Sequence, residues 1–200
     1  MSKVVIFDWG GVIMRTHDQG PRHAWDAHLG LPSGSVESVV HGLPEWEAAQ
    51  CGTISLDDYW VAVGANLGLS DRDLAGLRAD FYSGDQADGA LFDLIQNLNA
   101  DGIPVGLMSN NTLDLHDTLI ALNADSLFSA IVISAEIGVM KPDPAAYYAI
   151  VNAMGVAPEQ AVFIDDFMRN VEGARAIGME AIHFTPGIGL DEIVYQWLHA

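Results

Sequence analysis

KVVIFDWGGV, residues 3–12, is an apolar run that ends in a carboxylate and two glycines. Residues 4–7 are continuously apolar, which predicts a strand covered on both faces, as in a parallel sheet. Asp8 follows at the carboxyl end of that strand, the edge at which open α/β sheets bind ligands. This stretch therefore predicts both the kind of sheet and a polar side chain at its ligand-binding edge.

Four later segments share this Val- and Ile-rich character and alternate with helical patterns. The predicted strands are 103–108, 130–134, 161–164 and 180–184. The predicted helices around them are 88–100, 112–123, 144–154, 170–177 and 190–198. Because strands that alternate with helices are joined by right-handed βαβ crossovers, the predicted fold class is α/β, a doubly wound parallel sheet of Rossmann-like type.

Residues 20–84 break this alternation, because no segment there has a convincing strand pattern. Ser55 precedes an apolar helical run with Asp58 three residues on, and Ser70 precedes another with Asp73 at the same spacing. Both resemble capping boxes with Asp in place of Glu. Two shorter helices are indicated in PRHAWDAHLG and PEWEAAQCG, so this part of the chain is predicted to be all helical.

A length of 200 residues, half of them apolar, fits one ordinary domain that carries an insertion. We expect residues 1–15 and 85–200 to form the α/β core. Residues 16–84 would then be an inserted helical unit.

The charge of the chain restricts its partners. With 8 Lys and Arg against 27 Asp and Glu, the formal charge of −19 would repel nucleic acid and anionic membranes. The start, MSKVVIFDW, lacks the features of a signal peptide, and Cys51, the single cysteine, excludes an intrachain disulfide and a Cys-based metal cluster. We expect a soluble, cytoplasmic protein that acts on a small molecule, with no nucleic acid or membrane partner; its oligomeric state is unknown from sequence.

Polar clusters follow four of the predicted strands, and in such a sheet they would meet at one edge. They are Asp8, Ser109-Asn110-Asn111, Lys141-Pro142-Asp143 and Asp165-Asp166. Each cluster alone would be explained as a turn or a helix cap. Their coincidence at one edge, including one of only two lysines in the chain, is better explained by a functional site.

This set of side chains suits phosphoryl transfer through an aspartyl intermediate. A carboxylate that attacks a phosphate dianion needs positive charge nearby. A hard divalent cation held by Asp8 and the Asp165-Asp166 pair would supply part of it, since Mg²⁺ prefers oxygen ligands. The rest would come from Lys141, the Ser109 hydroxyl and the backbone N–H groups of Gly10 and Gly11.

The segments FDWGGV, LMSNN, GVMKPDPAAY and FIDDFMRNVEGARAIGM resemble, in this order, motifs one to four of the haloacid dehalogenase (HAD) superfamily. The helical insertion resembles the C1 cap of that superfamily, so the resemblance covers essentially the whole chain. It implies a Mg²⁺-dependent phosphatase that acts on a small phosphorylated metabolite through an aspartyl-phosphate. A phosphoacceptor signalling domain, with its early acid pair and no cap, and a dinucleotide-binding domain, with G-x-G-x-x-G, fit less well.

The resemblance also implies roles for individual residues. Asp8 would be the nucleophile and a metal ligand, and Lys141 would bridge nucleophile and phosphate as the second catalytic residue. The implied phosphate-binding residues are Trp9, Gly10, Ser109, Asn110 and Lys141. The implied metal ligands are Asp8, the Gly10 backbone carbonyl, Asp166 and Asp165, the last directly or through water.

Gly10 departs from the family pattern. Most phosphatases of the family carry a second Asp at this position, which protonates the leaving oxygen and later deprotonates the hydrolytic water; such help is worth roughly 10²- to 10⁴-fold. A protein that binds phosphate and metal but has lost efficient turnover is therefore an alternative. If the acid is replaced, His17 and His23 are candidates, with Arg15 as an electrostatic aid.

Three groups within the family lack this acid. Phosphonoacetaldehyde hydrolases use a cap lysine, but no lysine lies between Gly11 and Ser109. Haloacid dehalogenases attack carbon and lack the acid pair of the fourth motif. This sequence is most similar to capped sugar-phosphate phosphatases with FDxGxV, and a sugar 1-phosphate is the candidate substrate because an anomeric oxygen leaves readily.

Overall fold

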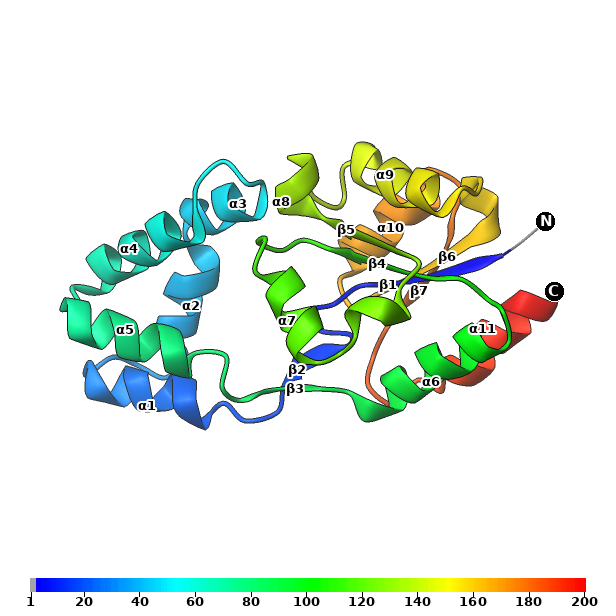
Figure 1. The fold of residues 1–200 in the computed structure, drawn as a ribbon. Helices are drawn as coiled ribbons and strands as arrows, with labels where there is room; N and C mark the ends of the chain where they lie inside the picture. The colour runs from blue at the N-terminus through cyan, green and yellow to red at the C-terminus, as the bar shows by residue number, and fades with distance from the viewer. Residues whose placement is uncertain (1–2) are drawn as a thin grey trace.

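A five-stranded parallel sheet in the order β5-β4-β1-β6-β7 forms the centre of the core (Figure 1). The computed structural model describes residues 3–200. The strands of this sheet are β1 Val4–Phe7, β4 Val105–Ser109, β5 Ala130–Ile133, β6 Ala161–Asp165 and β7 Glu180–His183. All five predicted strands and the α/β fold class are confirmed.

Helices cover both faces of the sheet. Those of the core are α6 Gly89–Ala100, α7 Leu115–Ala121, α8 Ser134–Ile137, α9 Pro144–Met154, α10 Met168–Ala176 and α11 Leu190–His199, with 3₁₀ turns η1 Asp125–Leu127 and η2 Pro158–Gln160. Alternate residues of β1 point to opposite faces: Val5 and Phe7 pack in a cluster with α6 and α11, and Val4 and Ile6 in a cluster with α9 and α10. This two-sided burial explains why the strand sequence is continuously apolar.

The register of the strands aligns their carboxyl ends. Phe7 pairs with Leu107 of β4 on one side and with Ile164 of β6 on the other. The three strands therefore end at the same edge of the sheet, which faces the helical part of the molecule on the left of Figure 1. The start of β1 and the end of α11 lie on the opposite side of the sheet.

Five helices between β1 and α6 form a separate cluster, which we call the helical unit (Figure 1). They are α1 Gly20–His28, α2 Ser35–Gly42, α3 Pro44–Gln50, α4 Leu56–Leu67 and α5 Asp71–Asp80. Ser55 and Ser70 cap α4 and α5 as predicted: each hydroxyl accepts from the backbone N–H three residues on. The hydroxyl also donates to the Asp carboxylate at that position, at 2.7 Å in both helices, in place of the reciprocal backbone bond of a Glu box.

A short antiparallel pair, β2 Met14–Thr16 and β3 Asp85–Ala87, connects the helical unit to the core. Neither strand was predicted from the sequence, because three residues are too few to show an alternating pattern. Helix α2 was also not predicted individually. The division of the chain at residues 15/16 and 84/85 stays a prediction.

Several element boundaries differ from those predicted, two of them by two or three residues for a local reason. Strand β4 starts at Val105 because Pro104 has no N–H to donate. Helix α7 starts only at Leu115, since Asn111 and Asp114 accept hydrogen bonds from Thr112 and hold a turn there. Helix α10 begins at Met168, two residues earlier than expected. Within residues 3–200, no helix combines the length and apolarity required to cross a membrane.

Candidate active site

Asp8 leaves β1 at the carboxyl edge of the sheet and is nearly buried. Its backbone N–H donates to the Ile164 carbonyl oxygen at 2.9 Å, which extends the β1–β6 pairing by one residue. Its Oδ1 accepts from the Trp9 N–H at 2.7 Å and lies 2.8 Å from Lys141 Nζ. Within residues 3–200 no hydrogen bond reaches Oδ2, so one carboxylate oxygen is oriented while the other is open to a reaction partner.

Lys141 connects the acid of the first motif to the acid pair of the fourth. Its ammonium lies 2.8 Å from Asp8 Oδ1 and 2.7 Å from Asp165 Oδ2, and it donates to the Met108 carbonyl at 3.2 Å. The side chain is 1% exposed. Burial favours the neutral amine, but the charges of Asp8 and Asp165 outweigh it and raise the pKa of Lys141. Lys141 is therefore a fixed positive charge beside Asp8.

Asp165 is fully buried and is already bonded by the chain at both oxygens. Oδ1 accepts from the Phe167 N–H at 2.7 Å, and the Asn170 amide donates to both oxygens at 3.1 Å. Oδ2 also receives the Lys141 ammonium. The geometry makes Asp165 an anchor for Lys141 and for the loop that carries Asp166.

Three carboxylates face a common point at this edge. Oxygens of Asp8, Asp165 and Asp166 lie within 4.8 Å of one another, and within the described chain Lys141 is the one cation in ion-pair contact with them. Burial raises the pKa of Asp8 to about 8, with Asp165 adding to the increase and Lys141 opposing it. Burial and Asp165 likewise raise the pKa of Asp166. This excess of negative oxygen donors fits a hard divalent cation.

Ser109 and Asn110, at the end of β4, line the same pocket as Asp8. The Ser109 side chain makes no hydrogen bond within residues 3–200. The Asn110 amide donates to the Lys141 carbonyl at 2.9 Å, and its Oδ1 accepts from the Lys141 N–H at 2.8 Å. The Asn110 side chain thus positions Lys141, and contact with a phosphate would fall to its backbone N–H.

Gly10 and Gly11 form the turn after Asp8. The Gly11 N–H donates to the Met14 carbonyl, and the Met14 N–H donates to the Trp9 carbonyl, both at 2.9 Å. Gly11 has φ +78°, and a Cβ there would lie 2.1 Å from Asp166 Oδ2. At Gly10 no atom lies within 4 Å of the position a Cβ would take. Gly11 is therefore required for close approach to Asp166, whereas Gly10 leaves open space beside Asp8.

These groups open into one pocket of about 780 Å³ between the core and the helical unit. The predicted site residues that line it are Asp8, Trp9, Gly10, Ser109, Asn110, Lys141 and Asp166. Asp165 lies beneath this surface, against Lys141. The structure thus brings all the predicted site residues to one edge of the sheet, although their roles stay predictions.

The polar residues in the wall opposite the core were missed by the sequence reasoning. Arg22, Glu37, His41 and Tyr82 line the pocket there, beside Trp46. His41 Nδ1 lies 4.0 Å from Glu37 Oε1, which in turn accepts from Arg22 at 2.6 Å. The i,i+4 spacing of Glu37 and His41 was the available signal, but it has meaning only once residues 35–42 are known to be helical.

The residues considered as replacements for the missing acid differ in whether they line the pocket. His17 and His23 are exposed and do not line the pocket, because the chain turns away from the core after β2. Arg15 does line it. Its guanidinium is ion-paired with Asp88 and lies over the Phe184 ring.

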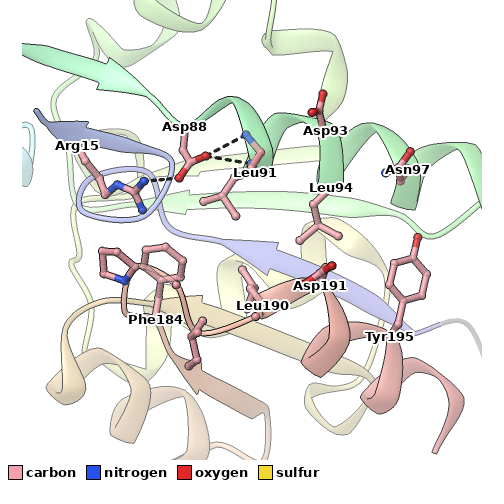
Figure 2. A pocket seen from close by; sticks show the side chains of 15 residues that line it. Arg15, Asp88, Leu91, Asp93, Leu94, Asn97, Phe184, Leu190, Asp191 and Tyr195 are labelled. Atoms are coloured by element: carbon pink, nitrogen blue, oxygen red, sulfur yellow. Dashed lines mark hydrogen bonds and ion pairs between the residues drawn. The ribbon is translucent and has the colours of Figure 1, made fainter.

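A second pocket, of about 480 Å³, lies between α6, α11 and the segment after β7 (Figure 2). Arg15 and Asp88 point toward each other at one end, and Asp88 also accepts from the first N–H groups of α6. Leu91, Leu94 and Leu190 line its middle (Figure 2). It contains none of the side chains from the four polar clusters.

Comparison with known proteins identifies a family of hydrolases and relatives that are phosphatases. Residues 2–178 match the family of haloacid dehalogenase-like hydrolases. The chain is 26% identical over 187 residues to a sesquiterpene phosphatase of Aspergillus oryzae, covering 93% of this chain and 91% of that protein. It is 28% identical over 122 residues to the phosphoglycolate phosphatase of Escherichia coli K12, covering 58% of this chain and 48% of that protein.

Among solved structures, a HAD family enzyme from Bacteroides thetaiotaomicron, in complex with magnesium and inorganic phosphate, superposes with a TM-score of 0.79. The match covers 96% of this chain and 99% of that one at 20% sequence identity, which shows a common fold. With the family match over most of its length, the chain belongs to the haloacid dehalogenase-like hydrolases.

Proposed function

We propose that this chain is a Mg²⁺-dependent phosphomonoester hydrolase that forms an aspartyl-phosphate at Asp8. The observation that carries the proposal is the convergence of Asp8, Lys141 and the Asp165-Asp166 pair at one pocket. Named phosphatases among the relatives, and the magnesium and phosphate bound by the Bacteroides neighbour, support the same class of reaction.

Asp8 is the proposed nucleophile. Trp9 and Lys141 hold its Oδ1, which leaves Oδ2 to attack phosphorus. The bond from phosphorus to the leaving alcohol breaks, and the phosphoryl group is transferred to Asp8. Water then attacks the acyl phosphate, which regenerates the Asp8 carboxylate and releases inorganic phosphate. Lys141 favours the ionised form of Asp8 that this attack requires.

The phosphoryl group would be bound by groups of the chain around Asp8. These are the Lys141 ammonium, the Ser109 hydroxyl and the backbone N–H groups of Trp9, Gly10 and Asn110. Asp8, the Gly10 carbonyl and Asp166 would hold Mg²⁺, and Asp165, whose two oxygens are already bonded by the chain, would do so directly or through a bound water. The ion, when bound, would offset the negative charge of the phosphoryl oxygens. We propose the helical unit, within residues 16–84, as the C1 cap over a core of residues 1–15 and 85–200.

The proposed substrate is a small phosphorylated metabolite with a neutral leaving group, with a sugar 1-phosphate as the first candidate. Arg22 in the wall of the pocket is paired with Glu37 at 2.6 Å and with Asp85 at 3.0 Å. Arg15 is paired with Asp88. Neither guanidinium is therefore available for a second anionic group of a substrate, whereas an anomeric oxygen is a good leaving group for a site without the usual acid.

The test is phosphate release from a substrate panel that contains sugar 1-phosphates, phosphoglycolate and para-nitrophenyl phosphate. We expect turnover with Mg²⁺, none with EDTA, and a loss of at least roughly 10³-fold in kcat for Asp8→Asn because the nucleophile is removed. Asp93→Asn, which alters the second pocket, is the matched control and should keep full activity. Activity that survives Asp8→Asn would contradict the proposal.

The alternative is a HAD-like protein that binds phosphate and metal without efficient turnover, and Gly10 is the observation that favours it. Tight, Mg²⁺-dependent binding of a phosphate-mimicking metal fluoride with no hydrolysis of any panel substrate would support this alternative. Turnover at ordinary enzymatic rates would exclude it.

A further inference from the structure

We propose that His41, on helix α2 of the helical unit, exchanges protons with the leaving alcohol and with the hydrolytic water. This inference rests on the proposed phosphatase function and assigns a residue to the role left vacant at Gly10. It gives the helical unit a part in the chemistry in addition to enclosing the substrate.

The space for such a group lies directly beside the nucleophile. No atom lies within 4 Å of the position where a side chain at residue 10 would begin. The pocket of about 780 Å³ extends from Asp8 to His41, so one substrate can lie between them. A phosphoryl group placed at Asp8 directs its leaving oxygen away from the core, toward the wall formed by the helical unit.

Three other acids that line the pocket, outside the four polar clusters, are engaged in contacts within the chain. Glu37 accepts from Arg22, and Asp85 accepts from both Arg22 and the Thr16 hydroxyl, at 3.0 and 2.6 Å. Asp114 accepts from the Thr112 hydroxyl. Burial raises the pKa of Tyr82 far above its usual range, which makes its hydroxyl a poor proton donor.

His41 is oriented from one side and open on the other. Its Nδ1 lies 4.0 Å from Glu37 Oε1, and its ring contacts Trp46, Phe81 and Tyr82 at centroid distances of 5.8, 5.3 and 6.4 Å. Within residues 3–200 neither ring nitrogen makes a hydrogen bond, because the 4.0 Å from Nδ1 to Glu37 Oε1 is beyond hydrogen-bond distance. An imidazole whose one nitrogen faces a carboxylate and whose other nitrogen is open has the arrangement of a proton-transfer group.

The charges around His41 place its titration below the usual range in the free protein. Partial burial and the Arg22 charge lower the pKa of His41, while Glu37 and Asp85 oppose the decrease. Tyr82, the remaining titratable group in contact with the ring, is neutral over the physiological range. A phosphate dianion bound in the pocket adds negative charge and so favours the imidazolium.

The proton balance closes over one turnover. While Asp8 attacks phosphorus and the bond to the leaving oxygen breaks, the His41 imidazolium gives its proton to that oxygen, and the alcohol departs neutral. Water then attacks the aspartyl-phosphate and gives one proton to neutral His41. Asp8 is regenerated as a carboxylate, inorganic phosphate leaves as the monohydrogen dianion, and His41 is again protonated.

The experiment compares His41→Gln with wild type on two substrates that differ in their need for an acid. For the best alkyl phosphate of the panel, kcat/KM should fall by roughly 10² or more, as for other general acids. For para-nitrophenyl phosphate, whose phenolate leaves without a proton, kcat/KM should change less than about threefold. The variant should also show a burst of nitrophenolate, because water attack on the aspartyl-phosphate is now slow.

His28→Gln is the matched control, since this histidine of the helical unit also faces a carboxylate, Asp73 at 3.7 Å, but lies outside the pocket. It should leave both substrates unaffected. In the His41→Gln background, Gly10→Asp should restore at least tenfold of the lost kcat/KM on the alkyl substrate, because the space at residue 10 is open.

Equal losses on both substrates, no loss on either, or no restoration by Gly10→Asp would overturn the role of His41. The proposed function is judged separately: para-nitrophenyl phosphate hydrolysis by wild type that needs Mg²⁺ and Asp8 upholds it whatever His41 does.

Above the pKa of His41, the wild-type kcat/KM for the alkyl phosphate should decrease with pH, and this decrease should be absent in His41→Gln.

Discussion

Of the two neighbouring glycines in the turn after Asp8, Gly11 is required by the geometry of the backbone and its surroundings, whereas Gly10 is not. Gly11 has a positive φ and lies against the Asp166 carboxylate, so a side chain there would meet a residue of the proposed metal site. Gly10 has neither a positive φ nor a close neighbour, so a side chain would fit there. Its absence removes the usual proton donor of the family. The same residue type therefore serves close packing at one position and leaves room for a substrate at the next.

Replacing Gly11 should damage the metal site selectively. Gly11→Ala places a Cβ at 2.1 Å from Asp166 Oδ2, so the carboxylate must move. We expect Mg²⁺ affinity, measured by calorimetry, to fall by at least about tenfold, and the free energy of unfolding to fall by about 1–3 kcal/mol from backbone strain.

Gly30→Ala is the control for the effect of backbone strain alone. Gly30 has φ +66° but no atom within 4 Å of its Cβ position. It should lose a similar free energy of unfolding and keep full Mg²⁺ affinity. Unchanged Mg²⁺ binding in Gly11→Ala would show that Asp166 does not hold the ion.

Among the elements, helix α2 is held at both ends by side chains of other helices. Its N-cap residue, Gly34, offers no side-chain hydrogen bond. Instead Asp26, on α1, accepts from the backbone N–H groups of Gly34 and Val36 at 2.7 and 2.8 Å. At the other end the Tyr59 hydroxyl, on α4, donates to the Val40 carbonyl at 2.6 Å. The helix that carries His41 is thus capped and held by other helices.

Removing the Tyr59 hydroxyl should loosen α2 without disrupting the packing of the ring. Tyr59→Phe leaves the buried Val40 carbonyl without its partner and should lower the free energy of unfolding by about 1–3 kcal/mol in urea titrations. Because Val40 precedes His41, kcat/KM for an alkyl phosphate should fall several-fold while that for para-nitrophenyl phosphate stays nearly unchanged.

Ser70→Ala is the control for Tyr59→Phe, because it should lower the free energy of unfolding without changing the contacts of α2. It removes the N-cap of α5 and should cost about 1 kcal/mol, with both activities kept. If the two variants lost activity equally, general loosening of the helical unit would explain the effect of Tyr59→Phe.

At the scale of the whole molecule, the site lies where two separately packed parts meet. The pair β2 and β3 joins them at one point, and α3 contacts the core at another. There the Gln50 side-chain amide donates to the Asn110 backbone carbonyl at 2.7 Å, and the Gln50 backbone carbonyl accepts from the Ser134 hydroxyl at 2.6 Å. The helical unit is thus bonded to the residue that positions Lys141.

The charge imbalance at the site should make the metal-free protein less stable as the pH rises. The pKa of Asp8, ordinarily 3.8, is about 8 in the folded protein because of burial. Between these values the folded state keeps a proton that the unfolded state has lost, so the free energy of unfolding falls with increasing pH. Burial and Asp165 shift Asp166 in the same direction.

The measurement is urea unfolding in EDTA between pH 5 and pH 8, on wild type and on Asp8→Asn. The variant cannot release this proton, so its advantage in free energy of unfolding over wild type should grow with pH. An advantage that stayed constant or shrank would show that Asp8 is ionised in the folded, metal-free protein.

The sequence by itself determined the core and its polar edge. Continuous apolar runs identify strands buried on both faces, and Asp8, Ser109 and Asp165 stand directly at strand ends or next to them, so their convergence follows from parallel topology. Lys141 joins them a short distance after β5, as expected from its place in the chain.

Only the tertiary structure decided what faces this edge. Residues 14–16 and 85–87 are too short to show a strand pattern, and α2 takes its cap from Asp26 on another helix, so neither is visible in local sequence. His41 and Glu37 reach the pocket because α1 and α4 pack on α2 and place it in the pocket wall. Strand-end positions are set by local pattern, whereas the opposing wall depends on long-range packing that no short window of sequence contains.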